Sequence, residues 1–139
     1  MAGLGTRLLK IKIGAVDYTA QVSKAVIVSG ESKADFVTFA DAAGGGAREY
    51  RLEFKAVQDA ATATLWDQVF TAAGTSVSCT LMPYGNAVAS ALEPHFTFSA
   101  TITEPDGDFI GGEADSSTSA RFTFECSWVL QAKPTRLAA

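Results

Sequence analysis

The chain has 139 residues, of which 47% are hydrophobic and 19% charged, and this composition excludes an intrinsically disordered protein. A chain of this length buries enough apolar surface for one hydrophobic core without disulfides or metals. The net charge of −4 and the lack of a basic stripe argue against binding to a phosphate backbone, and no apolar run approaches the ~18 residues that cross a bilayer.

The first predicted elements are two strands. In residues 9–13, apolar side chains alternate with lysines, which is the period of a half-buried strand, and a turn follows. A second strand is expected at residues 21–29. Its Val26, Ile27 and Val28 form a continuous apolar run, which predicts a strand covered on both faces.

Residues 30–47 are predicted to form a long protruding loop or hairpin. Within it, Phe36, Val37 and Phe39 lie between a polar lead and the flexible run at residues 42–46. A loop could hardly bury these side chains by itself, because they need an apolar surface to pack against.

Residues 48–75 are the most informative stretch, because a strand, a short helix and a helix stop follow one another directly. The inward residues of the strand are Tyr50, Leu52, Phe54 and Ala56. They alternate with charged residues, so one face is core and the other meets water or a partner. From Asp59 the apolar period becomes helical; Asp59 is expected to cap this helix and Gly74 to end it.

Three more alternating strands follow the helix. Their inward residues are Val77, Cys79 and Leu81 in the first, Phe96, Phe98, Ala100 and Ile102 in the second, and Phe122, Phe124, Cys126, Trp128 and Leu130 in the third. Residues 131–139 are expected to trail off as a C-terminal tail around Pro134. The sum is a single domain, 1–139, with six or seven strands and one helix. This pattern favours a mainly β (α+β) fold, an antiparallel β-sandwich or small barrel with one flanking α-helix.

Few residues suggest chemistry. Cys79 and Cys126 fall on inward positions, so we interpret them as buried free thiols, with a disulfide or reactive thiol as the alternative. His95 is the sole histidine, and without a second His or a Cys nearby it is interpreted as a structural or surface residue. No nucleophile elbow or P-loop occurs. We therefore predict no catalytic residue, no cofactor and no metal site.

The predicted loop at residues 105–119 is acidic together with the residue that precedes it. The carboxylates are Glu104, Asp106, Asp108, Glu113 and Asp115. Oxygen ligands suit a hard cation such as calcium, but the spacing does not fit an EF-hand loop. A solvated acidic turn is the preferred interpretation, with a weak cation site as the alternative.

Several segments together resemble one protein family. They are Leu-Trp-Asp-Gln-Val-Phe at 65–70, Ala-Gly-Thr at 73–75, Leu-Met-Pro-Tyr-Gly-Asn at 81–86, Pro-His-Phe at 94–96, Phe-Ile-Gly-Gly-Glu-Ala at 109–114, Ser-Trp at 127–128 and Lys-Pro at 133–134. With the order of elements, residues 48–134 resemble the tail tube (major tail) proteins of long-tailed, siphovirus-type bacteriophages, particularly those of actinobacteria. These segments carry structural signatures and no catalytic motif.

The resemblance implies a structural virion protein that assembles into hexameric rings stacked into a hollow tube, the conduit for genomic DNA ejection. Sheets of neighbouring subunits would join edge to edge, which removes exposed strand edges. The implied partners are further copies of the chain, the tape measure protein, and the tail terminator and tip proteins. Double-stranded DNA would pass without specific binding. The implied location is the tail of the virion, assembled in the host cytoplasm, with no membrane partner.

The resemblance also suggests roles for individual residues. The loop at 30–47 resembles the family's long loop that reaches an adjacent subunit or ring, which makes Phe36, Val37 and Phe39 candidates for inter-subunit contact. Carboxylates facing the channel would repel DNA phosphates as they pass. The candidates for this lumen-facing role are Glu49, Glu53, Asp106 and Asp108.

Two other functions remain open at this point. A tail-tip or baseplate module that binds carbohydrate or a receptor would expose Trp66 or Trp128 to its ligand. A small hydrolase would use the carboxylates of Asp106 and Asp108, and would lose its activity when either became an amide.

Overall fold

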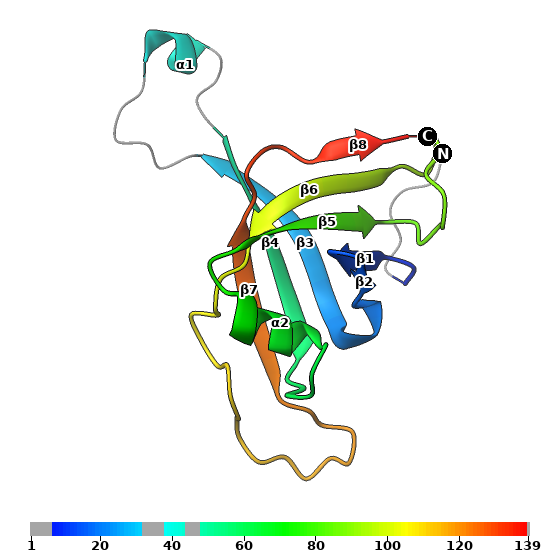
Figure 1. The fold of residues 1–139 in the computed structure, drawn as a ribbon, viewed down its shortest axis with the longest axis vertical. Helices are drawn as coiled ribbons and strands as arrows, with labels where there is room; N and C mark the ends of the chain where they lie inside the picture. The colour runs from blue at the N-terminus through cyan, green and yellow to red at the C-terminus, as the bar shows by residue number, and fades with distance from the viewer. Residues whose placement is uncertain (1–6, 32–37, 44–47, 139) are drawn as a thin grey trace.

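The fold is mainly β, as the sequence predicts. The computed structural model describes residues 7–31, 38–43 and 48–138. Strands account for 42% and helices for 12%, so the mainly β class is confirmed. Two antiparallel sheets and a flanking helix make up the sandwich (Figure 1). Within the described residues, none of the helices has the length and apolar character needed to cross a membrane.

The first sheet has five strands in the order β2-β1-β5-β6-β8. They are β1 (Lys10–Ile13), β2 (Val16–Asp17), β5 (Ser76–Met82), β6 (His95–Thr101) and β8 (Thr135–Leu137). The prediction that the chain trails off after Pro134 is wrong for β8, whose residues pair with the first half of β6. A strand this short has no pattern of its own, and it forms because β6 offers an unpaired edge.

The second sheet has three strands in the order β3-β4-β7. They are β3 (Val22–Glu31), β4 (Arg48–Val57) and β7 (Thr123–Val129). The central strand β4 pairs with β3 over almost its whole length and with β7 from Arg51 to Val57. The predicted alternation in β4 is confirmed, because Leu52, Phe54 and Ala56 are buried.

The core lies between the two sheets. The Phe54 and Trp128 rings meet edge to face with centroids 4.8 Å apart, and Phe124 packs edge-on against the other side of Phe54. Most predicted inward residues of β5, β6 and β7 belong to this core. Phe122 does not: β7 begins one residue later, and Phe122 is 46% exposed beside the backbone of Gly112.

The strand β3 is an edge strand that is covered on one face only. Ile27 packs against the core, whereas Val26 and Val28 are each 37% exposed. The prediction that both faces are covered is therefore wrong. Val26 and Val28 lie beside Glu53 and Arg51 of β4 on the outward face of the sheet, and the apolar run reflects the β-propensity of valine and isoleucine rather than burial.

The sandwich is closed along one side and open along the other. On the closed side, Ala100 of β6 forms a bridge with Leu130, and the amide of Gln131 donates to the carbonyl of Ser99 at 3.0 Å. On the open side, β3 faces β1, and no strand pairing joins these two among the described residues. One border of the sandwich is thus completed by the chain itself, and the other is not.

The flanking helix α2 (Leu65–Ala72) starts later than predicted. Its N-cap is Thr64, whose hydroxyl accepts a hydrogen bond from the amide of Asp67 at 3.2 Å. The predicted cap, Asp59, instead accepts from the amide of Ala61 in the preceding turn. Gly74 has φ +92°, so its predicted left-handed conformation just past the helix is confirmed.

The predicted loop at 30–47 is partly described. The strand β3 extends into it as far as Glu31, and a short helix α1 (Phe39–Ala43) follows. Figure 1 shows α1 standing well away from both sheets. Phe36 and Val37 lie outside the described residues, so their predicted contacts stay predictions. A single 3-10 turn, η1 (Thr19–Gln21), links β2 to β3.

Candidate functional site

An apolar groove lies between β3 and the five-stranded sheet, next to the open border. Its volume is ≈ 410 Å³. The lining residues are Leu9, Ala25, Val26, Ile27, Ser29, Tyr50, Leu81, Pro83, Phe96, Lys133 and Pro134. Ile27, Tyr50 and Phe96 pack against the core but are only half-buried, because no layer of the described chain covers them here. We call this surface the β3 groove.

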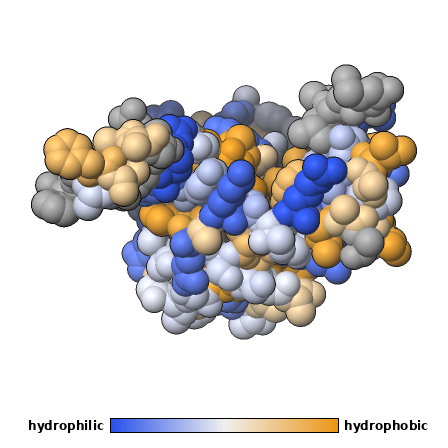
Figure 2. Space-filling model, turned by 90° about the horizontal axis from the view of Figure 1, so that it is seen from above, coloured by the Kyte–Doolittle hydropathy of each residue, from blue (hydrophilic) through white to orange (hydrophobic). Residues whose placement is uncertain are grey.

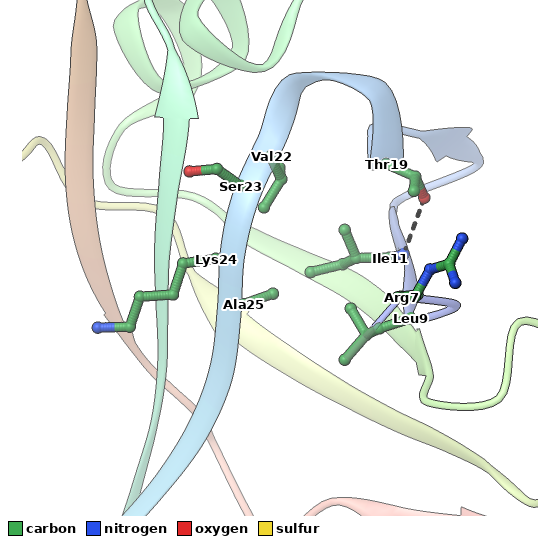
Figure 3. Close-up of a pocket in the computed structure, with 8 residues that line it drawn as sticks. All are labelled: Arg7, Leu9, Ile11, Thr19, Val22, Ser23, Lys24 and Ala25. Carbon is green, nitrogen blue, oxygen red and sulfur yellow. Dashed lines mark hydrogen bonds between the residues drawn. The ribbon is translucent and has the colours of Figure 1, made fainter. Parts of the chain in front are cut away.

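A second depression continues the β3 groove toward the start of β3. It also measures ≈ 410 Å³, and Leu9 and Ala25 line both hollows. Figure 3 shows Leu9 and Ile11 on one wall, facing Val22 and Ala25 on the other. Leu9 and Ala25 thus join the two hollows along the open border.

Hydrogen bonds around Thr19 hold the β1 wall of this depression. The Thr19 hydroxyl accepts from the amide of Ile11 at 3.1 Å and donates to Asp17. The Asp17 carboxylate also accepts from the amide of Thr19 at 2.8 Å. The hydroxyl bond, followed by the amide bond, holds the pKa of Asp17 below its ordinary value. This wall is therefore built before any partner binds.

The charged residues along the two hollows are all basic. They are Arg7, Lys24 and Lys133, and no carboxylate of the residues that the structure describes contributes to either lining. Figure 3 shows Lys24 extending across toward β4, away from the hollow's apolar walls. Lys133 is the one charged residue of the β3 groove itself. A cation without a carboxylate beside it, in a chain with a net charge of −4, favours an acidic partner.

The predicted contact residue Phe39 is 97% exposed at the first position of α1. No other large apolar side chain of the described residues is as exposed. In Figure 2, α1 is the group projecting at the left, and hydrophobic surface lies at its outer end. The described residues therefore leave this ring almost entirely in water.

The predicted lumen-facing carboxylates fall into two places. Glu53, Asp106 and Asp108 line one surface depression of ≈ 420 Å³ at the outward face of the three-stranded sheet. Glu49 lies outside it and forms an ion pair with Arg51 at 3.1 Å. Three of the four candidates thus share one depression, while Glu49 lies further along β4 on the same outward face.

This depression is not purely acidic. Its charged lining residues are Lys24, Glu53, Lys55, Asp106, Asp108 and Glu125. The hydrolase hypothesis would place Asp106 and Asp108 in it, but the only histidine, His95, lies at the start of β6 in the other sheet, where its Nε2 meets the carbonyl of Asn86 at 2.9 Å. His95 is therefore a buried structural residue, as predicted.

The two tryptophans have different surroundings. Trp128 is fully buried, and its indole nitrogen donates to the carbonyl of Thr103 at 3.1 Å. Trp66 is half-buried and stacks on Phe70, with ring centroids 5.0 Å apart, and its indole nitrogen donates to the carbonyl of Phe109. Phe70 is 53% exposed. Of the two, only Trp66 is placed to meet a ligand.

The cysteines are buried free thiols, as predicted. Burial raises the pKa of Cys79 to about 12 and that of Cys126 to about 12. At neutral pH both side chains are therefore neutral thiols that pack as small apolar residues.

Gln58 is a structural residue that sequence reasoning missed. Its side-chain nitrogen donates to the carbonyls of Thr123 at 2.8 Å and Gly111 at 3.0 Å, and its side-chain oxygen accepts from the amide of Gly111 at 2.7 Å. The only sequence signal is a polar residue directly after an alternating strand, which is equally typical of a solvated loop. Gly111, with which Gln58 forms two of these hydrogen bonds, is 53 residues away in the sequence.

Among the described residues, no three His, Cys, Asp or Glu side chains gather closely enough to hold a metal ion.

Comparisons with known proteins identify no relative of this chain. No protein-family model matches the chain, and a comparison with curated proteins finds no match.

Proposed function

We propose that this chain is a structural virion protein that assembles into stacked hexameric rings forming a bacteriophage tail tube. The observation that carries the proposal is the open border along β3. This strand is ten residues long, has a partner strand only on its β4 side within the described chain, and lies beside an apolar groove. Long exposed edges endanger a protein that remains alone, whereas a second copy would cover them.

The outward face of the three-stranded sheet supports the proposed role of the tube as a conduit for DNA. In a tube, the face with Glu53, Asp106 and Asp108 would border the lumen. Interspersed lysines would limit the negative potential there, while the carboxylates would keep phosphate groups from adhering. The tape measure protein and the terminator and tip proteins would be the remaining partners, as the resemblance implies.

The test measures assembly of the purified chain. We expect light scattering and negative-stain microscopy to show rings or tubes as the concentration rises. The double variant Ala25→Lys/Ser29→Lys should block them, because two charges would lie on β3 in the groove at the open border. The matched control Val88→Lys/Leu92→Lys adds the same charge at positions that are 78% and 88% exposed in the 86–93 loop.

Two outcomes would overturn the proposal. A wild-type chain that stays monomeric at every concentration would contradict the proposed assembly into rings and tubes. If the β3 variant assembles as wild type does while the loop control fails, the interface lies at the 86–93 loop instead.

The aromatic pair on α2, in which Trp66 is half-buried and Phe70 exposed, favours a second candidate function, a tail-tip module that binds carbohydrate. Phe70 and Trp66 stack nearly in parallel, with an interplanar angle of 13°, and Ile110 nearby in the 105–119 loop is 73% exposed. Sugar rings pack on such aromatic faces. Glycan binding would quench Trp66 fluorescence in the wild type and not in Phe70→Ala, and an unchanged spectrum across a glycan series would contradict this candidate.

A further inference from the structure

The β3 groove has the size and the composition of a site for a small molecule. Ligand pockets in proteins measure roughly 300–1,000 Å³ and are lined mainly by apolar and aromatic side chains, with a few polar groups that orient the ligand. The groove measures ≈ 410 Å³, and its lining includes the rings of Tyr50 and Phe96 and one charged residue, Lys133. An apolar cavity of about 150 Å³ holds one benzene ring, so the groove has room for a medium-length alkyl chain or two fused rings.

Both walls of the groove are built by the folded chain itself. Ile27 of β3 and Tyr50 of β4 lie on one wall, and the register partners Leu81 and Phe96 of β5 and β6 lie on the other. Ile27, Tyr50 and Phe96 are half-buried and pack against the core from below. Because paired strands hold these side chains, a ligand would not have to order a mobile segment in order to bind.

Two backbone hydrogen bonds hold the segment that brings Lys133 to the groove. The amide of Leu130 donates to the carbonyl of Tyr50 at 2.8 Å, and the amide of Gln131 donates to the carbonyl of Ser99 at 3.0 Å. Tyr50 belongs to the three-stranded sheet and Ser99 to the five-stranded sheet. The segment before Lys133 is therefore tied to both sheets, and the backbone of Lys133 is fixed at the rim.

The ammonium group of Lys133 is available to a ligand. No residue that the structure describes forms an ion pair or a hydrogen bond with this side chain, and no described carboxylate lines the groove. The long stem of a lysine lets the ammonium follow the position of a bound anion. A single cation at the rim of an apolar slot favours a ligand that is apolar along most of its length and carries one negative charge.

We propose that the β3 groove binds a small anionic amphiphile, a molecule whose apolar chain or ring system ends in one carboxylate. The apolar part lies between the wall with Ile27 and Tyr50 and the wall with Phe96, and the carboxylate meets Lys133 at the rim. Burial of the apolar part supplies most of the affinity, and the cation selects the charged end. All the lining residues belong to one copy of the chain, so this binding does not require the proposed assembly.

Octanoate and octanol are a matched pair of probes, because they share an alkyl chain and differ in the charged end. An NMR chemical-shift titration of the whole chain, below the concentration at which it assembles, should show octanoate shifting the amides of the groove residues and saturating. Lys133→Met should weaken octanoate binding about two- to fivefold, the range of a solvent-exposed ion pair, and leave octanol binding unchanged. The control Lys12→Met removes the same charge from an exposed position of β1 outside the groove and should bind both probes as wild type does.

A second variant tests the apolar slot. Ala25→Leu adds atoms to the β3 wall and should weaken both probes at least about tenfold, because these atoms occupy space that the ligand needs. Val28→Leu, on the outward face of the same strand and absent from the groove lining, is its control and should bind as wild type does. Circular dichroism checks that both variants fold, and the exposed Lys133→Met change decides the question if Ala25→Leu does not.

Three results would overturn this inference. They are a wild-type chain whose groove amides do not shift with octanoate, a Lys133→Met chain that binds octanoate as wild type does, and equal weakening by Lys12→Met. Each of them leaves the proposed assembly untouched. A chain that binds octanoate in the groove but never forms rings or tubes would contradict only the assembly.

Discussion

The two edges of the three-stranded sheet contrast with each other. Along β7, the chain finishes its own edge: Thr103 donates its hydroxyl hydrogen bond to the carbonyl of Ser127 at 3.2 Å, and Trp128 donates to Thr103 in return. Along β3, no described segment does the same. One edge thus serves the stability of a single molecule, while the other is available to a neighbour.

Removing the Trp128 side chain should have the largest effect on the closed edge. Trp128→Ala would leave a cavity at the centre of the core and an unpaired Thr103 carbonyl, so we expect a loss of about 3–5 kcal/mol in the free energy of unfolding. Urea denaturation followed by circular dichroism measures it. Val129→Ala, one residue further and 36% exposed, should cost less than about 1 kcal/mol. Similar losses for the two variants would contradict the burial of Trp128.

The cross-strand pair Leu52 and Ile27 compares the centre of the sheet with its open edge. The two residues are register partners, but Leu52 is fully buried and Ile27 half-buried. We expect Leu52→Ala to cost about 2–5 kcal/mol and Ile27→Ala roughly half as much in the monomer. Equal costs, measured by the same denaturation, would mean that the border along β3 is already closed.

Gln58 tests whether the loop at the closed edge depends on one side chain. Gln58→Ala would leave the carbonyl and amide of Gly111 and the carbonyl of Thr123 without these partners, at about 1–3 kcal/mol. We also expect faster proteolysis between residues 103 and 122. Gln131→Ala, which loses one exposed hydrogen bond to Ser76, is the control and should leave the cleavage rate unchanged.

The smallest effect should be an alkaline loss of stability from the buried thiols. Burial raises the pKa of Cys79 and of Cys126 to about 12, from an ordinary value of 9.0. The folded state therefore holds these protons more tightly than the unfolded state does. Their contribution is complete below pH 9.0 and is lost as the pH rises from there toward 12.

The double variant Cys79→Ala/Cys126→Ala isolates this contribution. We expect its free energy of unfolding to fall less than that of wild type between pH 8 and pH 10. Identical slopes would show that neither thiol is shielded from water in the folded chain.

The sequence predicts the closed parts of the molecule better than the open ones. Alternation in β4 and β7 identifies the inward residues, because a strand with one buried face has to place apolar side chains at every second position. The same logic fails for β3. Val26 and Val28 are apolar without being covered, so an apolar run at an edge looks like a run in a buried strand.

Features that depend on distant partners were missed for another reason. β8 is three residues long and acquires its pairing from β6. The role of Gln58 requires the backbone of Gly111 at its side. For α2, Asp59 and Thr64 are both suitable caps, and local preference alone does not decide between them.

Of the predicted contact and lumen residues, the structure places Phe39 on an exposed projection and gathers Glu53, Asp106 and Asp108 at one depression. Local sequence could not show this gathering, because β4 and the acidic loop meet only after the sandwich has formed.

The position of α1 also determines how the molecule would respond to mechanical load. The helix is connected to Glu31 at the end of β3 and to Arg48 at the start of β4, and these two residues are register partners. A pull on α1 would therefore open the β3–β4 ladder like a zipper, one pair after another, instead of loading all its bonds in parallel. The hydrogen bond from Arg48 to the hydroxyl of Ser29 lies at the point where such tearing would start.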